Sequence, residues 1–170
     1  MLNSLNITND NKILNKNLFE DKKNYMEDGN DIKWEDTTEF TFPIKGGRVI
    51  KVYDGDTITI ASKLPFNESP IYRLSVRLNG INTPEIKGKN ISDEEKEAAK
   101  NARDFVSNLI LNKYVKLENI ANEKFGRVLA DVYIGEIHLN NLLIKERYAL
   151  SYNGGTKEKN INWLNYRLNG

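Results

Sequence analysis

The chain has 170 residues, enough for one domain of ordinary size with a buried core. It contains no cysteine, which excludes disulfide bonds and thiolate metal sites, and no apolar run reaches the ~20 residues that a membrane-spanning helix needs. Residues 1–45 carry nine acidic residues and six lysines, a balance of −3, so the rest of the chain carries +4 of the net charge of +1. A mildly basic domain suits a polyanionic partner without proving one.

Residues 1–45 are rich in Asn, Lys, Asp and Glu and show no sustained hydrophobic period. We expect this N-terminal extension to be largely disordered, because too little apolar surface exists to offset the entropy of ordering it. A short amphipathic helix over Ile13–Phe19 is the alternative for one part. The alternation of Phe40, Phe42 and Ile44 predicts either the start of the first strand or a segment docked on the domain. The N-terminus has no apolar signal region, so an intracellular location is the default expectation.

Three strands are predicted in the first half of the domain. The β-branched segments Arg48–Tyr53 and Thr57–Ala61 flank Asp54-Gly55, which is a strong hairpin signal. Alternating residues over Tyr72–Leu78 predict the third strand. Residues 82–90 contain a proline and a glycine and are predicted to form an exposed loop.

A helix is predicted to follow this loop. Ser92 as N-cap and Glu95 three residues later have the spacing of a capping box. Its apolar residues recur with helical spacing: Ala98, Ala99, Ala102, Phe105, Val106, Leu109 and Ile110.

The last third of the domain predicts two strands, a short hairpin strand and a helix. The strands are Val115–Ile120 and Val128–Ile134, and the short strand is Ile137–Leu139. Asn140 is predicted to cap a helix that runs to Arg147. The order β-β-β-α-β-β-α predicts an α+β, mainly β fold over residues 46–170. We expect a five-stranded OB-like Greek-key barrel with two to three packed helices.

Three motifs carry residues suited to phosphate chemistry. The first is Asp54-Gly55-Asp56-Thr57, the second runs from Arg77 to Asn82-Thr83-Pro84-Glu85, and the third is Lys124-Phe125-Gly126-Arg127. Together they supply oxygen ligands for a hard cation, two arginines for a phosphate and one spare carboxylate as a general base. This combination suggests metal-assisted hydrolysis of a phosphodiester.

Each motif also has an ordinary explanation. Asp54-Gly55 can be no more than a type I′ turn, and Pro84-Glu85 a loop bend with a solvated carboxylate. Arg77 and Arg127 can be strand residues that pair with neighbours or face solvent. The functional interpretation is favoured because all of these explanations would have to coincide at one ordered spacing.

From about Gly46 to Tyr152 the chain resembles the staphylococcal nuclease, or thermonuclease-like, family. The segments that carry the resemblance are DGDT at 54–57, R-x(4)-NTPE at 77–85, the alanine-rich helix, KFGR at 124–127 and GEIHLNNLLIKERYALSY at 135–152. The resemblance implies an OB-like barrel and calcium-dependent hydrolysis of DNA and RNA with little sequence preference, leaving 3′-phosphate ends.

The resemblance also implies a role for each matched position. Asp56 and the main-chain carbonyl of Thr83 match calcium ligands, and Asp54 and Thr57 match residues that support the metal site. Arg77 and Arg127 match the arginines on the scissile phosphate. Glu85 matches the carboxylate proposed to activate water.

Two positions depart from the family pattern. Asn82 stands where the best-known members have a second calcium-binding aspartate, and an amide oxygen can bind Ca²⁺ but adds no negative charge. Phe125 stands where a tyrosine is familiar, so stacking is kept and a hydroxyl is lost.

The sequence therefore predicts a metal-dependent endonuclease that uses Ca²⁺, with Mg²⁺ or Mn²⁺ as alternatives. The expected partners are DNA and RNA, with single strands favoured because Tyr152 and Phe125 can stack on unpaired bases. Lys87, Lys89 and Lys124 would add phosphate contacts without reading sequence. A monomer without a membrane partner is expected. The competing hypothesis, motivated by Asn82, is a domain that binds nucleic acid or protein and is catalytically weak or inactive.

Overall fold

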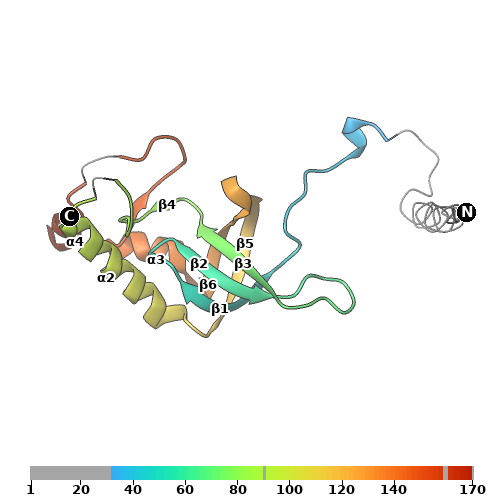
Figure 1. Ribbon diagram of the computed structural model, residues 1–170, viewed down its shortest axis with the longest axis horizontal. Coiled ribbons are helices and arrows are strands. Elements are labelled where there is room, and N and C mark those ends of the chain that lie inside the picture. Colours follow the sequence, from blue (N-terminus) through green and yellow to red (C-terminus); the bar gives the residue numbers. More distant parts are fainter. Residues whose placement is uncertain (1–31, 90, 159–160, 170) are drawn as a thin grey trace, which may run out of the picture. The chain divides into compact units, whose positions relative to one another are not determined.

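The computed structural model describes residues 32–89, 91–158 and 161–169 (Figure 1). The chain divides into two compact units, Met1–Glu39 and Phe40–Gly170. The described part of the first unit contains a short 3-10 helix, η1 (Trp34–Asp36). The alternative helix at Ile13–Phe19 and most of the extension expected to be disordered lie outside the described residues.

Five strands of the second unit close into a mixed barrel (Figure 1). They are β1 (Gly46–Val52), β2 (Thr57–Ser62), β3 (Tyr72–Leu78), β5 (Tyr114–Asn122) and β6 (Val128–Ile134). The pairs β1–β2, β2–β3, β1–β5 and β5–β6 are antiparallel, and a parallel pairing of β3 with β6 closes the barrel. The predicted five-stranded OB-like barrel in a mainly β fold is therefore confirmed.

Short strands and, among the residues that the structure describes, three α-helices complete the unit. The short strands β4 (Ile81–Asn82) and β8 (Leu150–Ser151) pair with each other, and β7 (Ile137–His138) extends the sheet beside β6. The helices are α2 (Asp93–Ile110), α3 (Leu139–Lys145) and α4 (Trp163–Asn169), of which α4 was not predicted. None of the described helices is long and apolar enough to cross a membrane.

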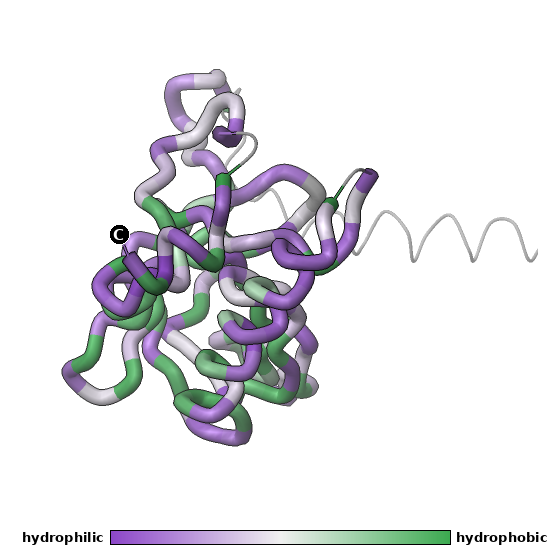
Figure 2. Tube along the Cα trace, turned by 90° about the vertical axis from the view of Figure 1, so that its left-hand side faces the viewer, coloured by the Kyte–Doolittle hydropathy of each residue, from purple (hydrophilic) through white to green (hydrophobic). Residues whose placement is uncertain are grey.

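The core lies inside the barrel and under α2. Figure 2 shows apolar and hydrophilic positions interspersed along the trace. In strands with one face buried, inward and outward positions alternate. The inward side chains include Val49, Ile58, Ile60, Val76 and Leu78, all fully buried. Each such side chain contributes roughly 1.5–3 kcal/mol relative to an exposed one. Phe42 and Ile44 also pack against this core, so the chain contacts the barrel before β1 begins.

Asn140 has a different role from the predicted one. The N-cap residue of α3 is His138, and Asn140 lies buried in the first turn of the helix. Its Oδ1 accepts a hydrogen bond from Val132 N at 3.0 Å, and its Nδ2 donates to Asn79 O at 2.8 Å. The amide therefore ties α3 to β6 and to the turn after β3, which a helix cap could not do.

Candidate active site

The loop between β1 and β2 carries the first motif. Tyr53 N donates to Thr57 O at 2.9 Å, which closes the loop. The predicted hairpin forms, since β1 and β2 pair across this loop. Neither Asp54 nor Gly55 is among the described residues with positive φ, so the alternative explanation as a type I′ turn, which needs positive φ at both central positions, does not hold. Gly55 is required for another reason: a Cβ there would lie 2.9 Å from Thr83 Cγ2 and 3.0 Å from the Cβ of Ala102. The loop is thus packed directly against the segment after β4 and against α2.

A buried network links the first two motifs. Asp56 Oδ1 lies 2.6 Å from Arg77 Nη1 and accepts a hydrogen bond from Thr57 Oγ1 at 2.9 Å. Arg77 Nη2 donates to Ile81 O at 3.2 Å. Thr57 and Arg77 are direct neighbours across β2 and β3. Since Asp56 is only 3% exposed and Arg77 only 9%, the pair is held in one geometry with little access to water.

Asp54 lies beside this pair and is also buried. Its Oδ1 accepts a hydrogen bond from Asp56 N at 3.0 Å. Burial, followed by repulsion from the carboxylates of Asp56 and Glu85, raises the pKa of Asp54 from 3.8 to about 7, although the backbone hydrogen bond opposes the shift. The site therefore concentrates negative charge that a cation could neutralise.

This shift predicts how stability depends on pH without metal. Between the ordinary pKa of 3.8 and the folded value of about 7, the folded state holds a proton on Asp54 that the unfolded state has lost. Stability should therefore fall as the pH rises through this window. We expect Asp54→Asn to flatten the decline and to raise Tm above that of the parent at pH 8 in EDTA, and to change Tm little at pH 4. Thermal melts at the two pH values measure this, and an equal Tm difference at both would contradict the assignment.

Asn82 and Thr83 are buried, at 7% and 2% exposure. The prediction of an exposed loop is wrong for this part because β4 pairs with β8 and the segment packs against Gly55. The amide Oδ1 of Asn82 is buried and has no hydrogen-bond partner. Leaving such an atom unsatisfied costs roughly 1–3 kcal/mol, and a functional ligand would explain it.

The chemistry of the predicted ligands suits a hard cation. Among the described residues no three His, Cys, Asp or Glu side chains group as a metal site, so binding would need amide and carbonyl oxygens as well as carboxylate. Asp56, the Asn82 amide and the Thr83 carbonyl offer oxygen atoms only, which are the ligands that Ca²⁺ accepts.

Glu85 follows the buried segment and is held from two sides. Its backbone N donates to Glu95 Oε1 at 3.2 Å, and its carboxylate forms an ion pair with Lys157. Ser92 Oγ accepts from Glu95 N at 3.1 Å, as predicted for the N-cap. The carboxylate of Glu95, however, holds the backbone of Glu85 instead of completing a capping box. The helix start thus positions Glu85 at the site.

Arg127 comes from the third motif, after the 3-10 helix η2 (Lys124–Gly126). Its Nε and Nη2 donate to the two carboxylate oxygens of Glu123 at 2.8 and 3.0 Å. Hydrogen bonding to Glu123 raises the pKa of Arg127 and lowers the pKa of Glu123. This side-on contact fixes the plane of the guanidinium, and Nη1 takes no part in it.

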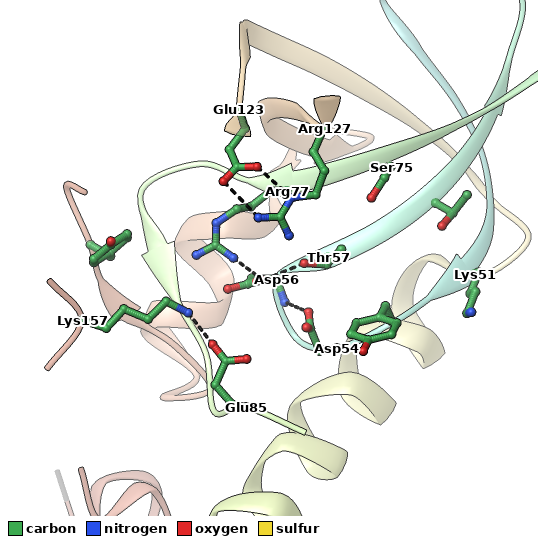
Figure 3. Close-up of a pocket in the computed structure, with 13 residues that line it drawn as sticks. Lys51, Asp54, Asp56, Thr57, Ser75, Arg77, Glu85, Glu123, Arg127 and Lys157 are labelled. Atoms are coloured by element: carbon green, nitrogen blue, oxygen red, sulfur yellow. Dashed lines mark hydrogen bonds and ion pairs between the residues drawn. The ribbon is translucent and has the colours of Figure 1, made fainter. Parts of the chain in front are cut away.

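One cavity of about 540 Å³ brings most of the predicted residues together (Figure 3). Those that line it are Asp54, Asp56, Thr57, Arg77, Glu85, Arg127 and Tyr152. Asn82 and Thr83 are buried but are not among the lining residues, and Thr83 packs against Gly55 in the loop that carries Asp56. Lys124 and Phe125 lie on η2, and the exposed residues Lys87 and Lys89 lie on the loop before α2. The three lysines do not line this cavity.

The cavity also contains residues that were not predicted: Lys51, Tyr53, Thr59, Ser75, Glu123 and Lys157. Three of them lie at outward-facing strand positions: Lys51, Thr59 and Ser75. Thr59 and Ser75 are two residues from the predicted site residues Thr57 and Arg77, and Lys51 is two residues from the start of the β1–β2 loop. Because side chains alternate between the two faces of a strand, these three could have been predicted from the sequence. Glu123 lies directly before the KFGR motif, but no α-helix is predicted there, so its spacing from Arg127 gives no signal of a pair. Lys157 had no local signal, because only the fold brings it to Glu85.

Comparison with known proteins finds similarity over most of the barrel unit. The model of the family described as staphylococcal nuclease homologue matches residues 75–166. A protein named thermonuclease from Staphylococcus hyicus is 34% identical over 104 residues, which cover 60% of this chain and 56% of that protein. An uncharacterized endonuclease of Haemophilus influenzae is 31% identical over 105 residues, covering 62% of this chain and 51% of its own length. The chain thus spans about half the length of the curated relatives that it matches.

Proposed function

The chain belongs to the staphylococcal nuclease homologue family, and from that membership we propose that it is a metal-dependent nuclease that hydrolyses phosphodiester bonds in DNA and RNA with little sequence specificity. In this proposal residues 46–170 form the nuclease domain and residues 1–45 an extension. The observation that carries the proposal is that Arg77, Arg127 and Glu85 line the same cavity as buried Asp56 (Figure 3). A site that only bound phosphate would have no need for the additional carboxylate.

Asp56, Asn82 Oδ1 and the carbonyl of Thr83 would hold the cation, with Asp54 and Thr57 supporting them. The unpartnered Asn82 oxygen and the surplus of carboxylates are what support this ligand set. A bound Ca²⁺ would polarise a phosphoryl oxygen and favour deprotonation of water. Mg²⁺ and Mn²⁺ remain alternatives to be compared in the assay.

The two arginines would neutralise the charge that develops on the phosphate. Arg77 is fixed through Nη1 and Nη2, and Arg127 through Nε and Nη2, so each guanidinium is oriented before substrate arrives. Preoriented donors stabilise developing charge without reorganising during the reaction. Arginine also offers planar, paired donors that lysine cannot reproduce.

Glu85 would act as the general base. One carboxylate oxygen is paired with Lys157, and the backbone is fixed by Glu95, so the second oxygen can be directed at a water molecule. The water oxygen attacks phosphorus while Glu85 accepts its proton, the bond from phosphorus to the 5′ oxygen breaks, and the leaving 5′ oxygen takes up a proton from solvent. The products would carry a 3′-phosphate and a 5′-hydroxyl.

Substrate outside the scissile phosphate would contact a second group of residues. We propose that single strands are preferred and that the protein acts as a monomer. Tyr152, at the cavity, and Phe125 would stack on bases. Lys87, Lys89 and Lys124 would contact phosphates at the rim.

The second candidate function is binding without catalysis, and Asn82 is the observation that favours it. Incubating single-stranded DNA or RNA with protein in calcium, magnesium, manganese or EDTA separates the two. Cleavage that only a divalent cation supports is expected. Binding without cleavage in every cation, with unchanged affinity in EDTA, would favour the binding module.

Changing Asn82→Asp should raise calcium affinity by about tenfold, because a carboxylate adds a negative charge to the ligand set. Calorimetric titration of Ca²⁺ into parent and variant measures this without reference to activity. Asn79→Asp, in the turn after β3, is the control that adds the same charge outside the cavity. An affinity unchanged by Asn82→Asp would mean that the amide is not a ligand.

A further inference from the structure

The outward face of β1, β2 and β3 is basic along its whole length. These three strands contain Arg48, Lys51, Arg73 and Arg77 and no acidic residue. Their opposite face is buried in the core, so the residues between the core positions point outward. Arg77 belongs to the candidate active site, whereas the function proposed above uses none of the other three.

Residues that are neighbours across β1, β2 and β3 form rows, and successive rows lead away from Arg77 in the active site. Lys51, Thr59 and Ser75 are neighbours across the three strands and line the active-site cavity. In Figure 3, Lys51 and Ser75 lie at the end of the cavity away from Glu85 and Lys157. The cavity therefore opens onto the sheet in the direction of the remaining arginines.

The next row crosses four strands. The strand pairings place Tyr114, Arg48, Ala61 and Arg73 side by side. Tyr114 is 64% exposed, and Arg48 and Arg73 are exposed as well. A second hollow of about 470 Å³ lies at this row, and its lining includes Tyr114, Arg48 and Lys63. An exposed aromatic ring beside guanidinium groups is the arrangement on which unpaired bases stack.

Within the part of the chain that the structure describes, the basic side chains on this face are not neutralised by acidic neighbours, so they can bind an anionic partner. No salt bridge among the described residues involves Arg48, Lys51 or Arg73. On the neighbouring strand, by contrast, Lys116 is paired with Glu118. Arg73 precedes Arg77 by four strand residues, so the row lies about 13 Å from the scissile site at ~3.3 Å per residue. A strand that fills the ~4–16 nucleotides that one OB-type barrel can cover is long enough to reach from the scissile site to this row.

We propose that this outward face, which we call the β1–β3 track, binds the part of a single-stranded nucleic acid that extends beyond the scissile phosphate. Arg48, Lys51 and Arg73 contact phosphates, and Tyr114 stacks on an unpaired base. The identity of the ligand rests on the proposed nuclease function. A duplex would not satisfy the track, because its bases are already stacked and paired.

The test measures binding in EDTA, so that it does not depend on cleavage. A labelled single-stranded oligonucleotide of about 12 nucleotides, near the middle of the range for an OB fold, is titrated with the parent and with variants Arg48→Ala/Arg73→Ala and Tyr114→Ala over a series of salt concentrations. The double variant should bind on the order of tenfold more weakly. Its log Kd should depend less steeply on log salt, by about 1.4, because each single-strand phosphate contact contributes ~0.7. Tyr114→Ala should weaken binding by about fivefold or more while keeping the salt slope.

The control is Lys100→Ala/Lys145→Ala, which removes the same charge from exposed positions on α2 and α3. Equal losses in the two double variants would show a general charge effect and overturn the proposal. So would parent-like affinity and slope in Arg48→Ala/Arg73→Ala, and that result would leave the nuclease proposal intact. If the parent binds but never cleaves, and the track variants lose binding, the nuclease proposal fails and the track stands. A parent that neither binds nor cleaves would overturn both.

Discussion

Replacing Glu85 with glutamine is expected to lower kcat by about 10²–10⁴, the usual contribution of a general base. Glutamine keeps the size of the side chain but cannot accept the proton of the attacking water. Loss of the Lys157 pair should matter little for stability, because an ion pair between partly exposed groups contributes roughly 0–1 kcal/mol. Binding of single-stranded DNA should weaken only modestly, since Glu85 acts on water and not on the phosphate.

Single-turnover cleavage and equilibrium binding, measured on the same preparations, separate these effects. Glu97→Gln, an exposed position on α2, is the matched control and should behave as the parent. If the Glu85→Gln variant cuts as fast as the parent, Glu85 is not the general base. A parallel fall in kcat and in binding would instead indicate a positioning role.

The second large effect is expected from Arg127→Lys, which keeps the charge but loses the fork of donors. We expect kcat/KM to fall by about 10²–10³, the loss typical of removing one oriented donor to developing charge. Lysine cannot bind Glu123 through two parallel hydrogen bonds, so the cation would also lose its fixed position. Folding should be preserved, because the Arg127–Glu123 pair is partly exposed.

Arg103→Lys provides the control, since Arg103 also binds a carboxylate through Nε and Nη2 but lies on the surface of α2. Steady-state kinetics and thermal melts of the two variants give the comparison. If Arg127→Lys retains more than about a third of the parental kcat/KM, a point charge is sufficient at this position and the paired donors of the guanidinium are not required.

The strands with the clearest alternation could be predicted to the residue. The bounds of β3 and β6 agree with the sequence pattern, because each has one face in the core and a period of two fixes which residues point inward. The helix α2 was found from its N-cap and its apolar stripe. The site motifs were found because their residue types are unusual together, and most of them line one cavity.

The remaining features depend on contacts between distant segments. Nothing near Asn82 in sequence shows that it is buried, since its burial follows from the pairing of β4 with β8. Gly55 looks like a turn glycine, but the constraint is the approach of Thr83 and Ala102. Lys157 and Glu85 are 72 residues apart. The carboxylate of Glu95 accepts a hydrogen bond from the backbone of Glu85 and does not cap its own helix. Such roles are decided by tertiary packing and leave no local pattern.

The most direct test of the central claim is a time course of single-stranded DNA cleavage in millimolar calcium, with EDTA added midway and calcium then restored. A nuclease built on Asp56, Asn82 and Thr83 should stop on chelation and resume on restoration, and its products should end in 3′-phosphates that block a polymerase until a phosphatase removes them. Cleavage that continues in EDTA, or protein that binds the strand without cutting it in any divalent cation, would contradict the account.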